Sequence, residues 1–131
     1  MSASDDGGAM AAQAAAQVID RLFATILARK GADAGQSYTA SLFAGGPKLI
    51  CRKVGEEAIE VTIEGLKGDA PAVCRESADL IYHLMVLWAE AGVTPDDVWA
   101  ELTRREGTSG HAEKASRGQG DGEKTETEGG A

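Results

Sequence analysis

Apolar positions recur at helical spacing through the middle of the chain. Over residues 18–27 they fall at i, i+3 and i+4, which predicts one helix that ends near residue 31. Further helices are predicted over 47–66, 71–92 and 94–105, because each has Pro near its start and Gly or basic residues near its end. No segment alternates with period two over the length of a strand. The pattern therefore predicts an all-α fold.

The two ends of the chain differ from this middle part. Residues 1–16 are Ala, Gly, Ser, Asp and Gln with two Met, which predicts a mobile, disordered arm. Residues 118–131 are acidic and rich in Gly, which predicts a disordered tail. One all-α domain over residues 17–117 is the expected organisation, since 131 residues are too few for two ordinary domains.

Charge and hydropathy exclude two classes of partner. Lys and Arg number 13 against 21 Asp and Glu, and a net charge of −8 argues against nucleic acid. The longest strongly apolar stretch, 80–89, is shorter than the ~18 residues that span a bilayer, so no membrane partner is expected. Asp5 and Asp6 lie where a signal peptide has positive charge, which predicts a cytoplasmic location.

Carboxylates on two consecutive predicted helices are the candidate chemistry. Glu56, Glu57 and Glu60 lie within about one turn of the second helix, and Glu76 and Asp79 lie three residues apart on the third. Like charges this close raise each other's pKa unless cations lie between them. Mg²⁺ is the favoured cation, because it accepts a few carboxylates and keeps other positions for water and phosphate oxygens.

A solvated acidic helix face is the alternative interpretation of these carboxylates. The second predicted helix is otherwise apolar nearly all round, which predicts that it is buried and that its acidic stripe faces an enclosed site. The acidic pairs are therefore interpreted as a metal site.

Basic residues and a histidine near the carboxylates are candidates for substrate binding. Lys53 lies one turn before the acidic run, where it could bind a substrate phosphate or neutralise the carboxylates. His83 could contact substrate or metal, or serve a packing role. Arg104 and Arg105 could bind phosphate or balance the C-terminus of their helix.

Several runs of residues resemble the phosphoribosyl-ATP pyrophosphatase family of the all-α MazG-type pyrophosphohydrolase superfamily. They are Ser37-Tyr38-Thr39, the run RKVGEEAIE over 52–60, the run ESADLIYHL over 76–84, and matching positions from Arg104 to Arg117. The resemblance covers about residues 18–117. It implies a four- to five-helix, bundle-like fold and hydrolysis of the α–β phosphoanhydride of phosphoribosyl-ATP by metal-activated water, the second step of histidine biosynthesis.

The resemblance also implies roles for individual residues. Glu57, Glu60, Glu76 and Asp79 would be ligands of Mg²⁺ or Mn²⁺, and Glu56 would be a further ligand or a base that orients water. The segment 107–117, which carries Lys114 and Arg117, would fold against the site and bring positive charge to the phosphates.

A homodimer is expected, because the predicted helices present more apolar surface than one short chain can cover. The family resemblance implies the same. Three other classes remain open: a house-cleaning nucleotide pyrophosphatase of the same fold, a di-iron four-helix protein and a non-catalytic helical interaction module. The di-iron class is disfavoured, since it uses Glu-x-x-His and this chain has Glu76-x-x-Asp79.

Overall fold

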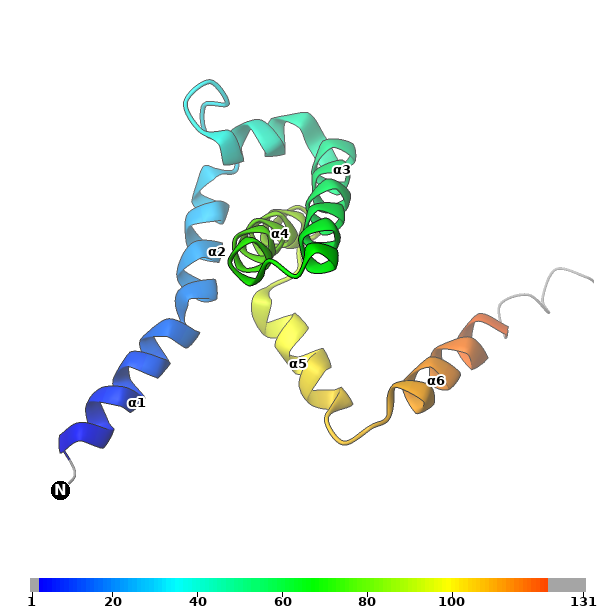
Figure 1. Cartoon of the computed structure of the whole chain (residues 1–131). Helices are drawn as coiled ribbons and strands as arrows, with labels where there is room; N and C mark the ends of the chain where they lie inside the picture. The colour runs from blue at the N-terminus through cyan, green and yellow to red at the C-terminus, as the bar shows by residue number, and fades with distance from the viewer. Residues whose placement is uncertain (1–2, 123–131) are drawn as a thin grey trace, which may run out of the picture. The chain divides into compact units, whose positions relative to one another are not determined.

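The computed structural model describes residues 3–122, and every regular element in this range is a helix (Figure 1). In chain order the helices are α1 (Ala3–Ala16), α2 (Val18–Arg29), α3 (Tyr38–Lys67), α4 (Ala70–Ala91), α5 (Pro95–Arg105) and α6 (Gly110–Gly122). The prediction of an all-α fold is confirmed. The chain divides after Pro95 into two compact units. Within the described residues, no helix combines the length and apolar composition needed to cross a bilayer.

Helix α3 is two helical segments joined by a kink. Gly46 has the left-handed φ of 81° with a ψ of −178°, and Pro47 begins the longer second segment, as the sequence predicts. The first segment was not predicted. It begins after Ser37, whose hydroxyl oxygen accepts a hydrogen bond from the Ala40 N–H at 3.2 Å. Leu42 on this short segment is fully buried, so packing stabilises a helix too short to show a clear pattern.

Helices α3 and α4 form a helical hairpin, the main packing contact of the first unit. Gly68 ends α3 in the left-handed conformation, with φ of 72°. The Asp69 carboxylate then caps α4 by accepting a hydrogen bond from the Ala72 N–H at 3.1 Å, and Pro71 occupies the first turn. The short turn sends α4 back along α3, which places the acidic runs of the two helices opposite each other.

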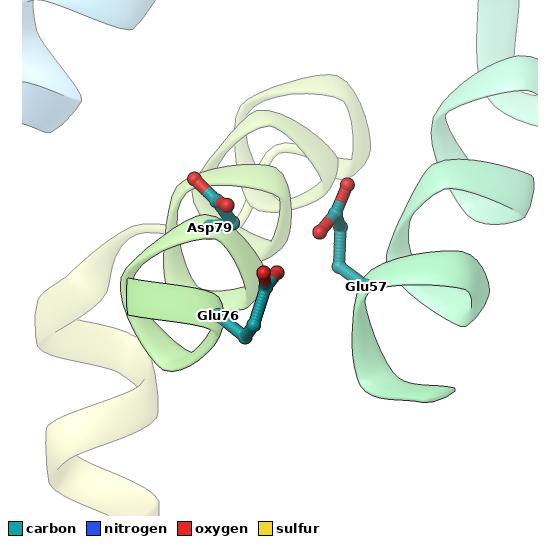
Figure 2. A group of neighbouring side chains, drawn as sticks. All are labelled: Glu57, Glu76 and Asp79. Atoms are coloured by element: carbon teal, nitrogen blue, oxygen red, sulfur yellow. The ribbon is translucent and has the colours of Figure 1, made fainter. Parts of the chain in front are cut away.

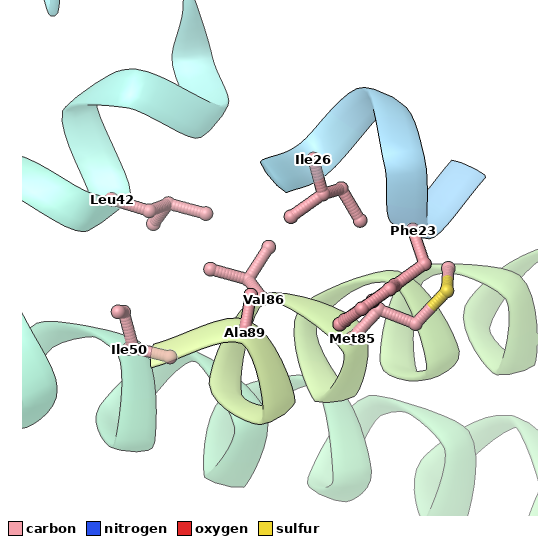
Figure 3. Close-up of a cluster of buried hydrophobic side chains, with 7 residues drawn as sticks. All are labelled: Phe23, Ile26, Leu42, Ile50, Met85, Val86 and Ala89. Carbon is pink, nitrogen blue, oxygen red and sulfur yellow. The ribbon is translucent and has the colours of Figure 1, made fainter. Parts of the chain in front are cut away.

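The core of the first unit lies where α2 and both segments of α3 pack on the second half of α4 (Figure 3). The buried side chains are Phe23 and Ile26 of α2, Leu42 and Ile50 of α3, and Met85, Val86 and Ala89 of α4. They fix the C-terminal half of α4 against its neighbours. The N-terminal half, which carries Glu76 and Asp79, lies beyond this cluster.

The second segment of α3 does not bury its apolar residues all round, contrary to the expectation from the sequence. Ile59, Ile63 and Leu66 are 61%, 45% and 86% exposed. Within one chain, this part of the helix packs mainly against α4, which covers a single side. Because apolar residues lie on nearly all sides of this helix and α4 covers only one of them, an apolar face of α3 stays exposed.

Helix α1 occupies the segment for which the sequence predicts a mobile arm. Its side chains from Asp6 onward are exposed. The prediction of disorder rested on the lack of large apolar residues that could be buried. Alanine has the highest intrinsic helix propensity, and this local preference does not require burial. Because α1 adds nothing to the buried core, a folded domain that begins near residue 17 stays a prediction.

Helices α5 and α6 belong to the second unit. Asp96 and Asp97 lie in the first turn of α5 and Arg104 and Arg105 in its last turn, which suits the helix dipole and agrees with the prediction. Helix α6 runs on to Gly122 and so enters the segment 118–131, for which the sequence predicts a disordered tail. The remainder of that predicted tail, 123–131, lies outside the described residues.

Candidate active site

Three carboxylates from the hairpin meet between its helices. Figure 2 shows Glu57 of α3 beside Glu76 and Asp79 of α4. Each offers one oxygen, and these three oxygens lie within 4.8 Å of one another. Glu57 precedes the turn by about as many residues as Glu76 and Asp79 follow it, so the hairpin itself brings them together.

Glu60 lies one turn further along α3 and also contacts Glu76. Partial burial raises the pKa of the Glu76 carboxyl above its ordinary value. The negative charge of Glu60, the hydrogen bond that protonated Glu76 donates to the Glu60 carboxylate, and the charges of Asp79 and Glu57 raise it further. The structure therefore places all four predicted metal ligands around one centre of negative potential.

No basic side chain neutralises this centre within the described part of the chain. Neither the cluster of three nor Glu60 forms an ion pair with Lys, Arg or His there. Repulsion among the carboxylates is therefore not relieved by the protein's own charges. A divalent cation with a preference for oxygen ligands fits this set of donors.

Glu56 is not part of the cluster of three. Its carboxylate forms ion pairs with Arg52 at 3.4 Å and with Lys53 at 3.2 Å. Successive side chains lie about 100° apart around the axis of a helix. Glu57 therefore faces α4, whereas Glu56 points away from the cluster and pairs with residues of its own helix. For Lys53 the structure shows neutralisation of a carboxylate, one of the two roles considered. The predicted roles of Glu56 as base and of Lys53 in substrate binding stay predictions.

His83 is buried, and protein groups occupy both of its ring nitrogens. Nδ1–H donates to the carbonyl oxygen of Asp79 at 2.7 Å, and Nε2 accepts from the Tyr38 hydroxyl at 2.8 Å. Direct binding of substrate or metal by His83, as predicted, requires one of these bonds to break. In this structure the histidine links the start of α3 to the turn of α4 that carries Asp79.

The run Ser37-Tyr38-Thr39 supports the site in a way that the sequence did not predict. Tyr38 bonds to His83, and the hydroxyls of Thr39 and Tyr82 are hydrogen-bonded to each other. These contacts join the first segment of α3 to α4. The motif was a signal of family resemblance, but its partners lie more than forty residues away and cannot be identified from spacing.

The basic residues of the second unit surround a buried glutamate. Arg104 donates to Glu113 at 2.8 Å and to both carboxylate oxygens of Glu101, at 2.7 and 3.0 Å. Arg105 donates to Glu101 at 3.0 Å, and Arg117 lies 3.8 Å from Glu113. These contacts join α5 to α6. The substrate-binding roles predicted for these arginines and for the exposed Lys114 stay predictions.

Acid should weaken this arginine–glutamate network. Hydrogen bonds from Arg104 and Arg105 lower the pKa of Glu101 to about 2, from an ordinary 4.5. A lowered pKa in the folded state gives stability that is present above pH 4.5 and lost as the pH falls towards 2. We therefore expect Glu101→Gln to destabilise the second unit at neutral pH and to have little effect near pH 2.

Urea titrations monitored by the amide NMR signals of residues 96–117 measure this difference. Glu106→Gln is the matched control, because Glu106 forms no ion pair within the described residues and the change of side chain is the same. An effect of Glu101→Gln that is equally large at both pH values would contradict the prediction.

An all-α chain with an acidic cluster between two consecutive helices has the architecture of the MazG-type pyrophosphohydrolases. Comparison with known families narrows this class. The phosphoribosyl-ATP pyrophosphohydrolase family matches residues 19–106. The chain belongs to this family, so the resemblance seen in the sequence motifs is confirmed.

Individual relatives agree with the family match, and each of these three is named phosphoribosyl-ATP pyrophosphatase. The protein of Azospirillum brasilense is 61% identical over 102 residues, which are 78% of this chain and 92% of that protein. The protein of Parvibaculum lavamentivorans is 56% identical over 79% of this chain and 95% of its own length. That of Rhizorhabdus wittichii is 57% identical over 78% and 96%.

Proposed function

We propose that this chain hydrolyses the α–β phosphoanhydride of phosphoribosyl-ATP to phosphoribosyl-AMP and pyrophosphate, the second step of histidine biosynthesis, in the cytoplasm. The observation that carries the proposal is the uncompensated cluster of Glu57, Glu76 and Asp79 in a member of this family. The names of the relatives support the choice of substrate.

The same cluster is the proposed site for Mg²⁺ or Mn²⁺. Glu57, Glu60, Glu76 and Asp79 would hold the cation, since they supply only oxygen donors and their charge lacks a counterion in the described chain. When bound, the metal supplies positive charge for the phosphate oxygens and activates the attacking water.

The protein's own residues position the ligands and the substrate. His83 fixes the backbone at Asp79, and Tyr38 fixes His83. Glu56 is proposed to orient water or to act as a further ligand. Lys53 and the basic residues of the second unit are proposed to bind phosphate oxygens, for which the last turn of α5 and helix α6 supply Arg104, Arg105, Lys114 and Arg117.

Release of pyrophosphate tests the proposal. We expect purified protein with Mg²⁺ to hydrolyse phosphoribosyl-ATP far faster than dUTP, dCTP or ATP, because the matched relatives are named for the first substrate. Equal or faster turnover of dUTP or dCTP would move the chain to the house-cleaning class. No turnover of any of these nucleotides, with no binding of metal, would favour a non-catalytic interaction module.

A homodimer is proposed to cover the apolar face of α3. Ile59, Ile63 and Leu66 are exposed on this face, and the neighbouring hairpin helix leaves Ile81 41% exposed. Exposed apolar residues gathered on one helical hairpin are typical of a protein–protein interface. We expect the protein to sediment at micromolar concentration as a species of twice 13.6 kDa.

Variants identify the surface that holds the dimer together. Ile63→Glu should shift the protein towards monomer, whereas Leu102→Glu, a change of the same kind on exposed α5, should not. A wild-type species of 13.6 kDa would contradict the proposal.

A further inference from the structure

A cavity of about 430 Å³, lined by residues with polar or charged groups, lies beside the acidic cluster. Its wall comes from the end of α2, from the loop before α3, from the start of α3 and from α4. Asp79 of the cluster is one of the lining residues, so the cavity and the acidic cluster adjoin. The volume is in the range of sites for small ligands.

Most polar side chains of the cavity wall are already engaged with protein groups. Tyr38 donates to His83, and Thr39 and Tyr82 are bonded to each other. The hydroxyl of Thr25 donates to a backbone carbonyl of its own helix. These groups shape the wall, and their hydrogen-bonding capacity is largely used.

Arg29 and Gln36 differ from these engaged residues of the cavity wall. Both side chains line the cavity, and neither has a hydrogen bond or ion pair within the described part of the chain. The basic neighbour Lys30 does not line this cavity and lies 4.0 Å from Glu90. The arginines of the second unit are engaged with Glu101 and Glu113. Arg29 is thus a free guanidinium facing a cavity that adjoins a cluster of carboxylates.

A guanidinium without a carboxylate partner suits an anion with paired oxygens. Its planar fork of N–H donors matches phosphate in a bidentate way, and the Gln36 amide adds two more donors. A ligand that reaches both Arg29 and a cation at the acidic cluster would carry anionic oxygens at both points, as phosphate groups do. The substrate of the proposed reaction has two such parts, the triphosphate and the 5-phosphate of its second ribose.

We propose that this cavity is a substrate subsite in which Arg29, with Gln36, binds a phosphoryl group. The inference rests on the proposed function and adds a residue that determines substrate affinity. The ligand chemistry is a phosphate with at least two free oxygens, and it is supplied either by the triphosphate or by the ribose 5-phosphate.

Arg29→Gln tests the subsite. Because Arg29 is exposed and makes no contact that the fold needs, the variant should fold. We expect its KM for phosphoribosyl-ATP to rise tenfold or more with a smaller change in kcat, and Arg29→Lys to recover part of the loss. Lys30→Gln removes the same charge one residue away, outside the cavity, and should leave KM within twofold of the wild type.

Two competing ligands identify the phosphate. Inhibition of the wild type by ribose 5-phosphate that is lost in Arg29→Gln assigns the subsite to the second ribose, whereas loss of inhibition by ATP assigns it to the triphosphate. A KM and both inhibition constants within twofold of the wild type would overturn the inference.

Calorimetric titration of wild type and Arg29→Gln with the same two ligands separates this inference from the proposed function. If the wild type does not hydrolyse phosphoribosyl-ATP, the proposed function fails. Weaker binding of either ligand by Arg29→Gln would then still support the subsite, and equal binding would overturn it.

Discussion

Glu76→Gln and Asp79→Asn are each expected to lower the rate of pyrophosphate release by about a hundredfold or more. Both residues belong to the cluster of three carboxylates, and an amide cannot supply the negative charge that holds a divalent cation. Changes to groups that only support a metal ligand already cost about 10- to 100-fold, so loss of the ligand itself should cost at least as much.

The same variants should be at least as stable as the wild type when metal is absent. Burial and three neighbouring carboxylates raise the pKa of Glu76, which means that its ionised form destabilises the metal-free fold at neutral pH. An amide removes this repulsion. Thermal unfolding in excess EDTA, followed by circular dichroism, measures the difference, and adding Mg²⁺ should stabilise the wild type more than the variants.

Glu64→Gln is the matched control for these substitutions. Glu64 lies on α3 one turn after Glu60, but its carboxylate pairs with Lys67 at 3.5 Å. The change of side chain is the same as in Glu76→Gln, and the activity should stay near that of the wild type. Full activity of Glu76→Gln, or of the wild type in excess EDTA, would exclude the two-helix metal site.

The sequence predicted the elements that local patterns determine. Proline at the start and glycine at the end of a periodic segment predicted the bounds of α4 within one or two residues. Spacing indicated the acidic runs on the two helices, and the family resemblance implied which of these carboxylates are the ligand pairs. The first segment of α3 was missed because it spans about two turns before Gly46. Its stability comes from Leu42 in the core rather than from a repeated pattern.

Side-chain direction and distant partners could not be predicted in the same way. Glu56 and Glu57 are adjacent and chemically identical, and only the position of α4 shows which of them joins the cluster. Similarly, the pairing of Arg104 with Glu113 depends on how α6 returns to α5. The cavity at Arg29 depends on three segments that are separate in sequence, so no local signal indicates it.

Truncation after Glu106 is expected to raise the KM for phosphoribosyl-ATP tenfold or more, or to abolish turnover. It removes helix α6 with Lys114 and Arg117, which are proposed to bind phosphate oxygens, and it removes the Glu113 partner of Arg104. Charge-assisted contacts contribute about 1.5–3 kcal/mol each, and about 1.4 kcal/mol corresponds to a factor of ten in binding. Loss of a single contact of this kind is therefore enough for the expected change.

Truncation after Arg117 is the matched comparison and should leave activity within about twofold of the full chain. Residues 118–131 have no large apolar side chain that could pack against the domain, so their loss removes little stability.

The double substitution Lys114→Ala and Arg117→Ala in the full chain then separates the effect of positive charge from the structural effect of α6. If it reproduces the KM change, α6 acts through its positive charge; if it does not, α6 acts by ordering Arg104 through Glu113. Equal activity of both truncated proteins would show that segment 107–117 has no role in the reaction, because the buried Glu113 and its partner Arg117 are absent from only one of them.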